Sequence, residues 1–287
     1  MTLLVPAPSG SSSDTGFDAY LGAARHRYLG EGHRRVTTDV SPLHRVDDAA
    51  FEGAAHITYP VDWSRKAGAD RSPHLSTVDA IRIAGRVHAS LVASGSDLLA
   101  RFPFERALHV RAGARPWEAL EDVPIRTELV ALPNTAGVRL EHRIGSLKME
   151  SEWVESAQPH AVDEQWEAGQ ASNIKLTGEA QIHCVYQRRS PHVSLMSFLE
   201  AMMLTAQMSQ VALYGGDASR RDQSGNMWMR RASFVRHVAN VRRAAPTSVT
   251  LHDRRSVTIE GRSIDLAEVD AANVFGIQVT ASLASGS

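Results

Sequence analysis

Two histidines of the sequence each stand in a Ser-Pro-His turn directly before a long apolar segment. The turns read R-S-P-H-L-S at 71–76 and R-S-P-H-V-S at 189–194, so they contain His74 and His192. If a helix follows each turn, the positive end of its dipole disfavours a second positive charge on the imidazole. A neutral imidazole near pH 7 can act as a general base. We therefore treat both histidines as candidate catalytic residues, with backbone hydrogen bonding at the turn as the structural alternative.

A serine and an aspartate follow the first histidine with the spacing of a helix cap. Ser76 and Asp79 stand three residues apart, which matches the capping-box pattern. In the second copy we align Ser194 and Ser197 with them, so the acid is expected in the first copy alone. Asp79 could assist His74 in catalysis, or it could only stabilise the helix start, a contribution of roughly 0.3–1 kcal/mol.

The segment at 61–71, before the first turn, has no counterpart of the same length in the second copy. It carries a tryptophan and several cations, which suit a lid that holds an anionic or phosphorylated group. A solvated surface loop is the alternative. The strand-like segments at 107–112 and 227–235 add cations that could line a shared cleft. The candidate substrate-binding residues are Asp62, Trp63, Lys66, Arg71, Ser76, Arg111 and Arg230.

These candidates must be positioned by the two apolar segments at 75–92 and 195–213. Each segment carries apolar residues over more than one face of a helix, which is typical of a buried helix. Charged residues within them, such as Arg82, Arg86 and Glu200, argue against membrane spans. Two equivalent helices entered by the same turn indicate two copies of one unit, in agreement with a length of 287 residues.

The rest of the chain alternates apolar and polar residues with the period of β-strands. Two expected strands precede each helix, at 36–40, 51–59, 174–180 and 181–187. Several follow each helix, at 107–112, 125–132, 138–144, 147–154, 227–237, 248–254, 257–260 and 274–283. A further helix is expected over 17–29.

Strand, buried helix and antiparallel strands, repeated once, predict an α+β double hotdog, in which each sheet wraps one long buried helix. The two sheets are expected to pair edge to edge, which removes an exposed edge from each. The predicted organisation is a disordered tail at 1–16, an N-terminal hotdog at 17–155, a linker at 156–169 and a C-terminal hotdog at 170–287. The tail is assigned from its Pro, Gly and Ser content.

Composition and motifs argue against several function classes. The formal net charge of −1 gives no indication of nucleic acid or a membrane surface as a partner. The single cysteine, Cys184, lies in an expected strand, which favours a buried structural thiol over a nucleophile. We find no metal-binding or glycine-rich phosphate-binding motif, so we expect no metal ion and no cofactor. The lone cysteine and the lack of a secretion signal favour a cytoplasmic protein.

Three motifs resemble the bacterial avirulence D (AvrD) family. They are Y-L-G-E-G-H-R-R-V at 28–36, Y-P-V-D-W-S-R-K at 59–66 and P-H-L-S-T-V-D-A at 73–80, and the resemblance covers most of the chain. It implies a biosynthetic enzyme that makes small acyl-sugar signals of the syringolide type from a β-ketoacyl thioester and a ketose such as xylulose. In its use of β-ketoacyl chains the family is similar to the A-factor synthases, which also use paired hotdog units.

The expected function is transfer or condensation of the acyl chain from acyl-CoA or an acyl carrier protein onto such a sugar. The amides at the start of the first helix would bind the carbonyl oxygen, and His74 assisted by Asp79 would take a proton. Lys66 and Arg71 would hold a phosphate. Two alternatives remain open: a 3-hydroxyacyl-thioester dehydratase or hydratase, and a non-catalytic acyl-binding module. Besides the acyl substrate and its carrier protein, we expect neither a nucleic acid nor a membrane as a partner. The chain is expected to be a monomer or a homodimer.

Overall fold

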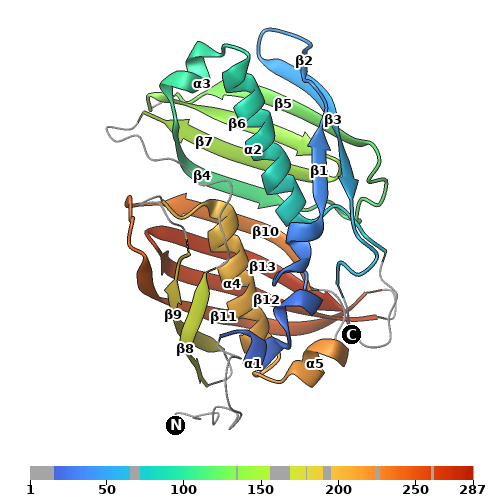
Figure 1. Cartoon of the computed structure of the whole chain (residues 1–287), viewed down its shortest axis with the longest axis vertical. Coiled ribbons are helices and arrows are strands. Elements are labelled where there is room, and N and C mark those ends of the chain that lie inside the picture. The colour runs from blue at the N-terminus through green and yellow to red at the C-terminus, as the bar shows by residue number, and fades with distance from the viewer. Residues whose placement is uncertain are drawn as a thin grey trace.

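The strands of the chain form one large antiparallel sheet, and two long helices lie on one face of it (Figure 1). The structure is a computed structural model that describes residues 16–64, 72–133, 135–155, 169–178, 180–189, 195–223, 227–259 and 262–286. The long helices are α2 (Thr77–Ala93) and α4 (Phe198–Leu213). A large antiparallel sheet that carries helices, as expected from the alternation of the sequence, is confirmed.

The remaining elements are short helices and the strands themselves. The short helices are α1 (Asp18–Leu21), η1 (Ala24–His26), η2 (Gly32–Arg35), α3 (Asp97–Arg101) and α5 (Ala218–Gln223). The first seven strands are β1 (Thr37–Val40), β2 (His44–Arg45), β3 (Ala50–Thr58), β4 (Phe104–Arg111), β5 (Val123–Ala131), β6 (Gly137–Ile144) and β7 (Leu147–Val154). The last six are β8 (Gln170–Thr177), β9 (Gln181–Gln187), β10 (Met227–Arg236), β11 (Ala244–Ile259), β12 (Arg262–Val274) and β13 (Ile277–Gly286).

The two halves of the sheet have the same connectivity. From the edge to the middle, the strands of the first half run β1-β3-β5-β6-β7-β4, and those of the second half run β8-β9-β11-β12-β13-β10. In each half the strand that directly follows the long helix lies at the middle of the sheet. There β4 and β10 pair antiparallel, with Leu108 opposite Phe234. One continuous sheet therefore replaces two exposed edges, as expected.

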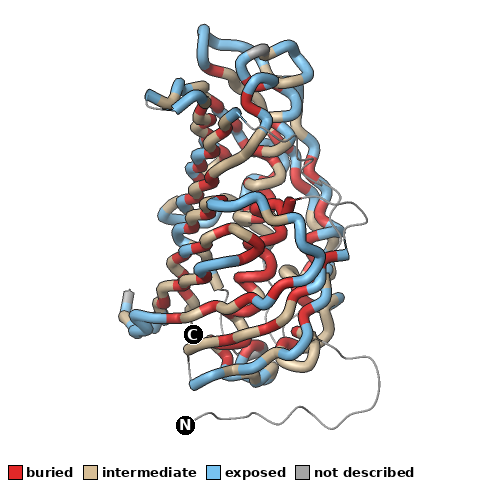
Figure 2. Tube along the Cα trace, turned by 90° about the vertical axis from the view of Figure 1, so that its left-hand side faces the viewer, coloured by how far each residue is buried: buried red, intermediate tan, exposed pale blue. Residues whose placement is uncertain are grey.

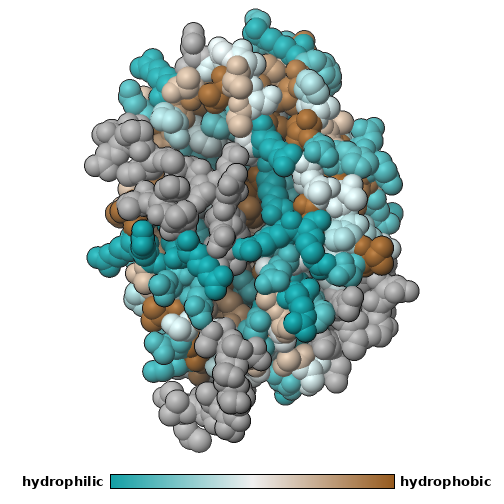
Figure 3. Space-filling view, in the orientation of Figure 1, coloured by the Kyte–Doolittle hydropathy of each residue, from teal (hydrophilic) through white to brown (hydrophobic). Residues whose placement is uncertain are grey.

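The two long helices differ in how much of their surface is buried. In α4 nearly every side is covered, and both Met203 and Met208 are completely buried. In α2 one stripe that includes Ile83 and Val87 is buried, whereas Arg86 is exposed. Figure 2 shows the buried residues gathered between sheet and helices, and Figure 3 shows hydrophilic side chains over the face that carries α2 and β1. The expectation of a helix apolar on all sides is therefore correct for α4 and wrong for α2.

Both long helices begin at a serine cap, but the caps are not the same serine of the repeated motif. Ser76 Oγ accepts from the amide of Asp79, and the Asp79 carboxylate accepts from the amide of Ser76, so the expected capping box is confirmed. The cap of α4 is Ser197, whose side chain accepts from the amide of Glu200. The prediction of Ser194 as the cap is wrong, because the serine-to-acid spacing of the first cap recurs at 197–200.

The N-terminal segment ties the two halves together. α1 packs against α4, and the hydroxyl of Tyr20 donates to the carbonyl oxygen of Ile174 in β8 at 3.3 Å. The single helix expected over 17–29 is wrong, because Gly22 adopts a φ of 77° and ends α1. Two short 3₁₀ helices follow, and the segment then enters β1 at the edge of the first half.

Two strand predictions need correction in the second half. The segments expected at 248–254 and 257–260 form one strand, β11, because a bulge with Asp253 at a φ of 51° interrupts its alternation. The predictions missed β12 and began β13 too early at residue 274. The turn between these strands is made by Phe275 and Gly276, both at positive φ. Charged residues such as Asp265 and Glu268 make β12 hard to recognise from its sequence.

The change between the two halves falls between the end of β7 at Val154 and the start of β8 at Gln170. The predicted tail and linker lie almost wholly outside the described residues, at 1–15 and 156–168. In the described part of the chain, no helix combines the length and the apolar character that crossing a membrane requires.

Candidate functional site

A cavity of about 190 Å³, which we call cavity 1, lies at the N-terminal end of α2. Its walls come from the N-terminal segment, the start of α2, the turn after β4 and the beginning of β10. Met202 and Ala206 from α4 complete it. The cavity therefore combines residues of both halves of the sheet with the segment that ties them together.

The carboxyl group of Asp79 is completely buried beside cavity 1 and accepts hydrogen bonds from three hydroxyl groups. Ser76 Oγ donates at 2.6 Å, Tyr28 donates at 3.3 Å, and Tyr59 also donates to it. Burial raises the pKa of Asp79, while these donors and the nearby Arg82 partly offset the effect. Asp79 is not among the residues that line the cavity, so it acts on that space through the hydroxyl groups that it holds.

Two tyrosines and a tryptophan form one wall of cavity 1. The rings of Tyr28 and Tyr59 stack with centroids 6.0 Å apart, and Trp63 meets them edge-on at 5.4 and 5.1 Å. Burial and the charge of Asp79 raise the pKa of both tyrosines, so they remain neutral hydrogen-bond donors. The loop can place Trp63 here because residue 32 is glycine: a Cβ on Gly32 would lie 2.1 Å from Trp63 O.

His74 lines cavity 1 at the entrance to α2. Its Nδ1 lies 3.4 Å from the carbonyl oxygen of Ser72. Among the described residues Asp79 is bonded by hydroxyl and amide groups, and the His74 imidazole is not one of its partners. Any assistance that Asp79 gives to His74 is therefore not through a direct hydrogen bond, and the catalytic roles of both stay a prediction. The two are joined only indirectly, since the Tyr59 hydroxyl that donates to Asp79 also lies 3.2 Å from the main-chain oxygen of His74.

The first turn of α2 contributes two residues, Thr77 and Val78, to the lining of cavity 1. The capping box uses the amides of Ser76 and Asp79, and the amide of Ala80 donates to Ser76 O. Thr77 and Val78 line the cavity, and first-turn amides such as theirs have no acceptor within the helix. Amides at a helix N-terminus can bind a carbonyl oxygen or an oxyanion.

Among the described residues that line cavity 1, those that can carry a charge near neutral pH are His74 and four arginines, with no carboxylate. Arg27 is buried and donates to Asp18 at 2.6 Å and to Gln207 at 2.9 Å. Arg230 is an exposed residue that lines the cavity, and its role in binding substrate stays a prediction. Because Arg27 is already paired with Asp18, the exposed Arg230 is the cation that favours a ligand with an anionic group.

Several predicted site residues lie elsewhere. Asp62 forms an ion pair with Arg35 at 2.6 Å on the surface, and Arg111 is an exposed residue of β4 opposite Arg231 of β10. Neither Asp62 nor Arg111 is among the described residues that line cavity 1. The predictions for Lys66, Arg71 and His192 fall outside the described residues.

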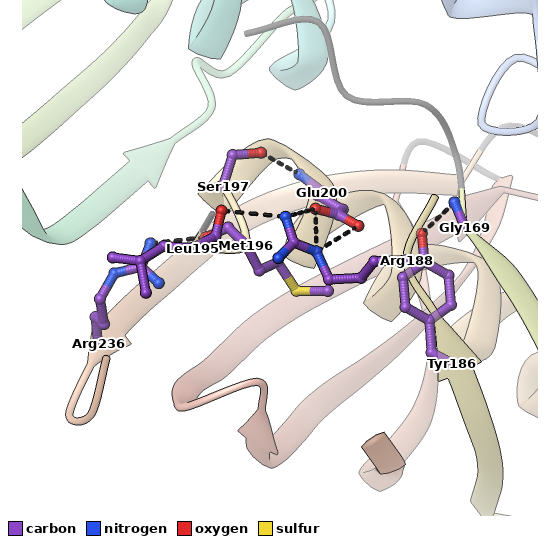
Figure 4. A network of polar contacts seen from close by, with 8 residues as sticks. All are labelled: Gly169, Tyr186, Arg188, Leu195, Met196, Ser197, Glu200 and Arg236. Carbon is purple, nitrogen blue, oxygen red and sulfur yellow. Dashed lines mark hydrogen bonds and ion pairs between the residues drawn. The ribbon is translucent and has the colours of Figure 1, made fainter. Parts of the chain in front are cut away.

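The start of α4 also holds a buried acid (Figure 4). Glu200 is 1% exposed and forms an ion pair with Arg188 at 3.0 Å, and Arg188 Nη2 also donates to Leu195 O at 3.1 Å. The expected asymmetry, with an acid in the first copy alone, is therefore wrong: Glu200 rather than Ser197 stands at the position of Asp79. The helix starts differ in the partner of the acid, which is a set of hydroxyl groups in one and a guanidinium in the other.

Cys184 is buried, as expected for a structural thiol. Burial raises its pKa to about 12, and its sulfur lies 3.7 Å from Met208 Sδ. Within the described ranges, no group of three or more His, Cys, Asp or Glu side chains is arranged to hold a metal ion.

The segments that build cavity 1 fall within the range matched by a protein-family model. The family described as Pseudomonas avirulence D protein (AvrD) matches residues 12–193 and 184–285. The chain belongs to the AvrD family. Tyr28 and Tyr59 were not predicted as site residues, yet each opens one of the AvrD-like motifs, at 28–36 and 59–66. That position is the signal by which the two tyrosines could have been found.

Solved structures similar to this AvrD-family chain are distant from it. The tesB protein of Mycobacterium avium subs paratuberculosis is 15% identical, covering 90% of this chain and 98% of its own, with a TM-score of 0.42. The acyl-CoA thioesterase II TesB2 of Mycobacterium marinum is 13% identical over 85% and 94%, with a TM-score of 0.41. A trans-AT PKS dehydratase domain from Brevibacillus brevis is 13% identical over 74% and 85%, with a TM-score of 0.41. No curated protein matches by sequence.

Proposed function

We propose that this AvrD-family chain is a cytoplasmic enzyme that transfers or condenses the acyl chain of a β-ketoacyl thioester onto a sugar such as xylulose. The product would be a small acyl-glycoside or lactone, and the donor would be acyl-CoA or an acyl carrier protein. The scaffold in this proposal is a pair of tandem hotdog units at 17–155 and 170–287. The identical strand order of the two half-sheets supports the pairing.

The observation that carries the proposal is the composition of cavity 1, which joins apolar walls to a helix N-terminus. Met202, Ala206 and Leu147 provide apolar surface for the acyl chain. The amides of Thr77 and Val78 are available to the thioester carbonyl oxygen and to the oxyanion formed during acyl transfer. Exposed Arg230 at the mouth suits a phosphate of the carrier group.

His74 is the proposed general base, because its imidazole lines the same cavity. A sugar hydroxyl loses its proton to His74, and its oxygen forms a bond to the acyl carbon. The carbon–sulfur bond then breaks, and the departing thiolate receives the proton. Tyr28 and Tyr59 donate their hydroxyl protons to Asp79, so their oxygens can accept hydrogen bonds from the sugar. Asp79 is a positioning residue that holds both hydroxyl groups.

The dehydratase alternative needs a histidine and an acid on opposite sides of one substrate. Among the described residues that line cavity 1 there is no carboxylate, so this reading loses support there. A non-catalytic acyl-binding module would also bind the thioester, so turnover and not binding distinguishes it from the proposed enzyme.

The test is a reaction of the purified full chain with 3-oxooctanoyl-CoA and xylulose. Free thiol is measured with a chromogenic thiol reagent, and the acyl-sugar product is measured by mass spectrometry. We expect His74→Ala to slow product formation by about 10²–10⁴-fold. His252→Ala, at an exposed position of β11, is the matched control and should retain the wild-type rate.

Two results would overturn the proposal. Release of thiol without an acyl-sugar product would indicate a thioesterase. Tight binding of the thioester with no turnover by the wild-type chain would indicate a binding module. Equal rates for wild type and His74→Ala would remove His74 from the mechanism.

A further inference from the structure

A second and larger space, which we call cavity 2, lies on the side of α2 that faces β1 and the start of α4. Its volume is about 670 Å³. Residues of β1, α2, β4 and β7 line it together with the first residues of α4. Figure 3 shows hydrophilic side chains over the face that carries α2 and β1, two of the elements that line cavity 2. The proposed function makes no use of this cavity.

Cavity 2 is the counterpart of cavity 1 in the second copy of the repeat. Counting from the caps Ser76 and Ser197, cavity 1 is lined by positions one and two of α2 (Thr77, Val78) and by positions five and nine of α4 (Met202, Ala206). Cavity 2 is lined by positions one and two of α4 (Phe198, Leu199) and by positions five and nine of α2 (Ile81, Gly85). The two spaces are therefore built by equivalent parts of the two halves.

Two arginines that line cavity 2, Arg82 and Arg86, are bonded by carbonyl oxygens among the described residues. Arg82 Nη1 donates to His33 O at 2.7 Å, and Arg86 Nη1 donates to Thr38 O. These carbonyl bonds hold both guanidinium groups while leaving their other N–H donors unused. In the described part of the chain neither arginine forms an ion pair. Two arginines one helical turn apart suit the oxygens of a carboxylate or phosphate.

Polar groups without a hydrogen-bond partner among the described residues also line cavity 2. His88 stacks on Trp153 with centroids 3.6 Å apart, and within the described ranges its buried Nε2 makes no hydrogen bond. Thr38 is buried, and its Oγ1 likewise has no partner in the described part of the chain. Glu105 lines the same space, and no hydrogen bond or ion pair to its carboxyl group is found among the described residues. Burial raises the pKa of Glu105 to about 7, although Arg236 lowers it in part.

A glycine keeps this space open. Gly85 stands within α2, where glycine is unfavourable relative to alanine. A Cβ added at Gly85 would meet no atom within 4 Å. Helix α2 therefore has glycine, which lowers helix stability, at a position where a side chain would fit. The space that such a side chain would enter is cavity 2.

We infer that cavity 2 is a second ligand site, which binds a small hydroxylated molecule bearing one carboxylate or phosphate group. Arg82 and Arg86 bind the anionic group, and His88, Thr38 and Glu105 pair with the hydroxyl groups. Asp39 also lines the cavity, so a doubly charged anion must place its second charge away from β1. The inference does not depend on the proposed reaction in cavity 1.

The test is isothermal titration calorimetry on the full chain with four probes: ribose 5-phosphate, gluconate, ribose and inorganic phosphate. The two hydroxylated anions should bind more tightly than ribose or phosphate alone. Arg86→Gln should weaken their binding by roughly tenfold, since it removes charge-assisted hydrogen bonds. Arg255→Gln, at an exposed position of β11, is the matched control and should bind like wild type.

A second variant tests the place of binding without removing a charge. Gly85→Leu should fill cavity 2 and abolish binding of ribose 5-phosphate, whereas Ala89→Leu, exposed one turn later on α2, should not. Circular dichroism establishes that both variants are folded. The inference is overturned if neither hydroxylated anion binds the wild-type chain, if Arg255→Gln weakens binding as much as Arg86→Gln, or if folded Gly85→Leu binds normally. Ribose 5-phosphate without gluconate binding would identify phosphate as the preferred anion.

Discussion

Asp79 and Glu200 stand at the same position, the third residue of α2 and of α4, but their buried carboxylates have different partners. Tyr59, Tyr28 and Ser76 hold the first, and the guanidinium of Arg188 neutralises the second. One acid therefore holds the hydroxyl groups of three residues that line cavity 1, whereas the other is part of an internal ion pair. This difference distinguishes the starts of the two long helices.

The ion pair between Arg188 and Glu200 gives a prediction about stability. Both side chains are nearly inaccessible, at 3% and 1% exposed. Arg188→Met should lower the free energy of unfolding by about 3–5 kcal/mol, because it leaves a buried carboxylate without its counter-charge. The double variant Arg188→Met/Glu200→Leu should recover most of that loss. Urea unfolding measures both, and a loss below about 1 kcal/mol in the single variant would contradict the assignment.

Tyr59→Phe tests the hydroxyl groups around Asp79. It removes a donor from a completely buried carboxylate, so it should cost about 1–3 kcal/mol of unfolding free energy. Tyr20→Phe is the control, because its hydroxyl bonds only a carbonyl oxygen at 3.3 Å, and it should cost less. Thermal or urea unfolding ranks the two variants, and the opposite order would show that Asp79 does not depend on Tyr59.

The stacked His88 predicts how stability changes with pH. Burial lowers its pKa from 6.5 to about 4. Between these two pH values the His88 imidazole therefore stays neutral in the folded chain but binds a proton in the unfolded chain. The stabilising effect of the neutral form is complete above pH 6.5 and is lost as pH falls toward 4. His88→Phe keeps the aromatic stack and should reduce the stability difference between pH 7.5 and pH 5 by about 1–2 kcal/mol. Urea unfolding at the two pH values checks it; an unchanged difference would place the pH dependence in other groups.

Buried His142 should contribute in the same direction. Its pKa is lowered to about 3 by burial, and its Nδ1 lies 2.9 Å from Thr127 Oγ1. The His88→Phe variant retains His142, so its unfolding free energy should still decrease as the pH falls below 6.5. A profile of stability against pH that is flat is therefore not expected.

Two glycine substitutions should change stability in opposite directions. Gly85→Ala adds a methyl group in open space within a helix and should raise the unfolding free energy by about 1 kcal/mol. Gly32→Ala should lower it, because the new Cβ would lie 2.1 Å from Trp63 O, a main-chain atom that cannot move independently. Differential scanning calorimetry compares the two, and destabilisation by Gly85→Ala would mean that this side of α2 is more crowded than the structure indicates.

Much of the fold could be predicted from the sequence because its signals are local. Alternation of apolar and polar residues predicts most of the strands, and serine followed three residues later by aspartate predicts the start of α2. Strand β12 and the bulge at Asp253 escaped prediction, because charges and one extra residue interrupt the alternation. The AvrD-like motifs at 28–36, 59–66 and 73–80 indicated the family without any structural information.

The site itself depended on contacts between distant parts of the chain. Local spacing places His74 and Asp79 at one helix start, but it cannot show that Tyr28 and Tyr59 bond to Asp79 while His74 does not. It also aligned Asp79 with Ser197, whereas the position of the α4 cap aligns it with Glu200. Sequence therefore determined which elements form, since hydrogen bonding and periodicity act over a few residues. Tertiary structure decided which side chains share a buried space, because that follows from how the two half-sheets and the N-terminal segment pack together.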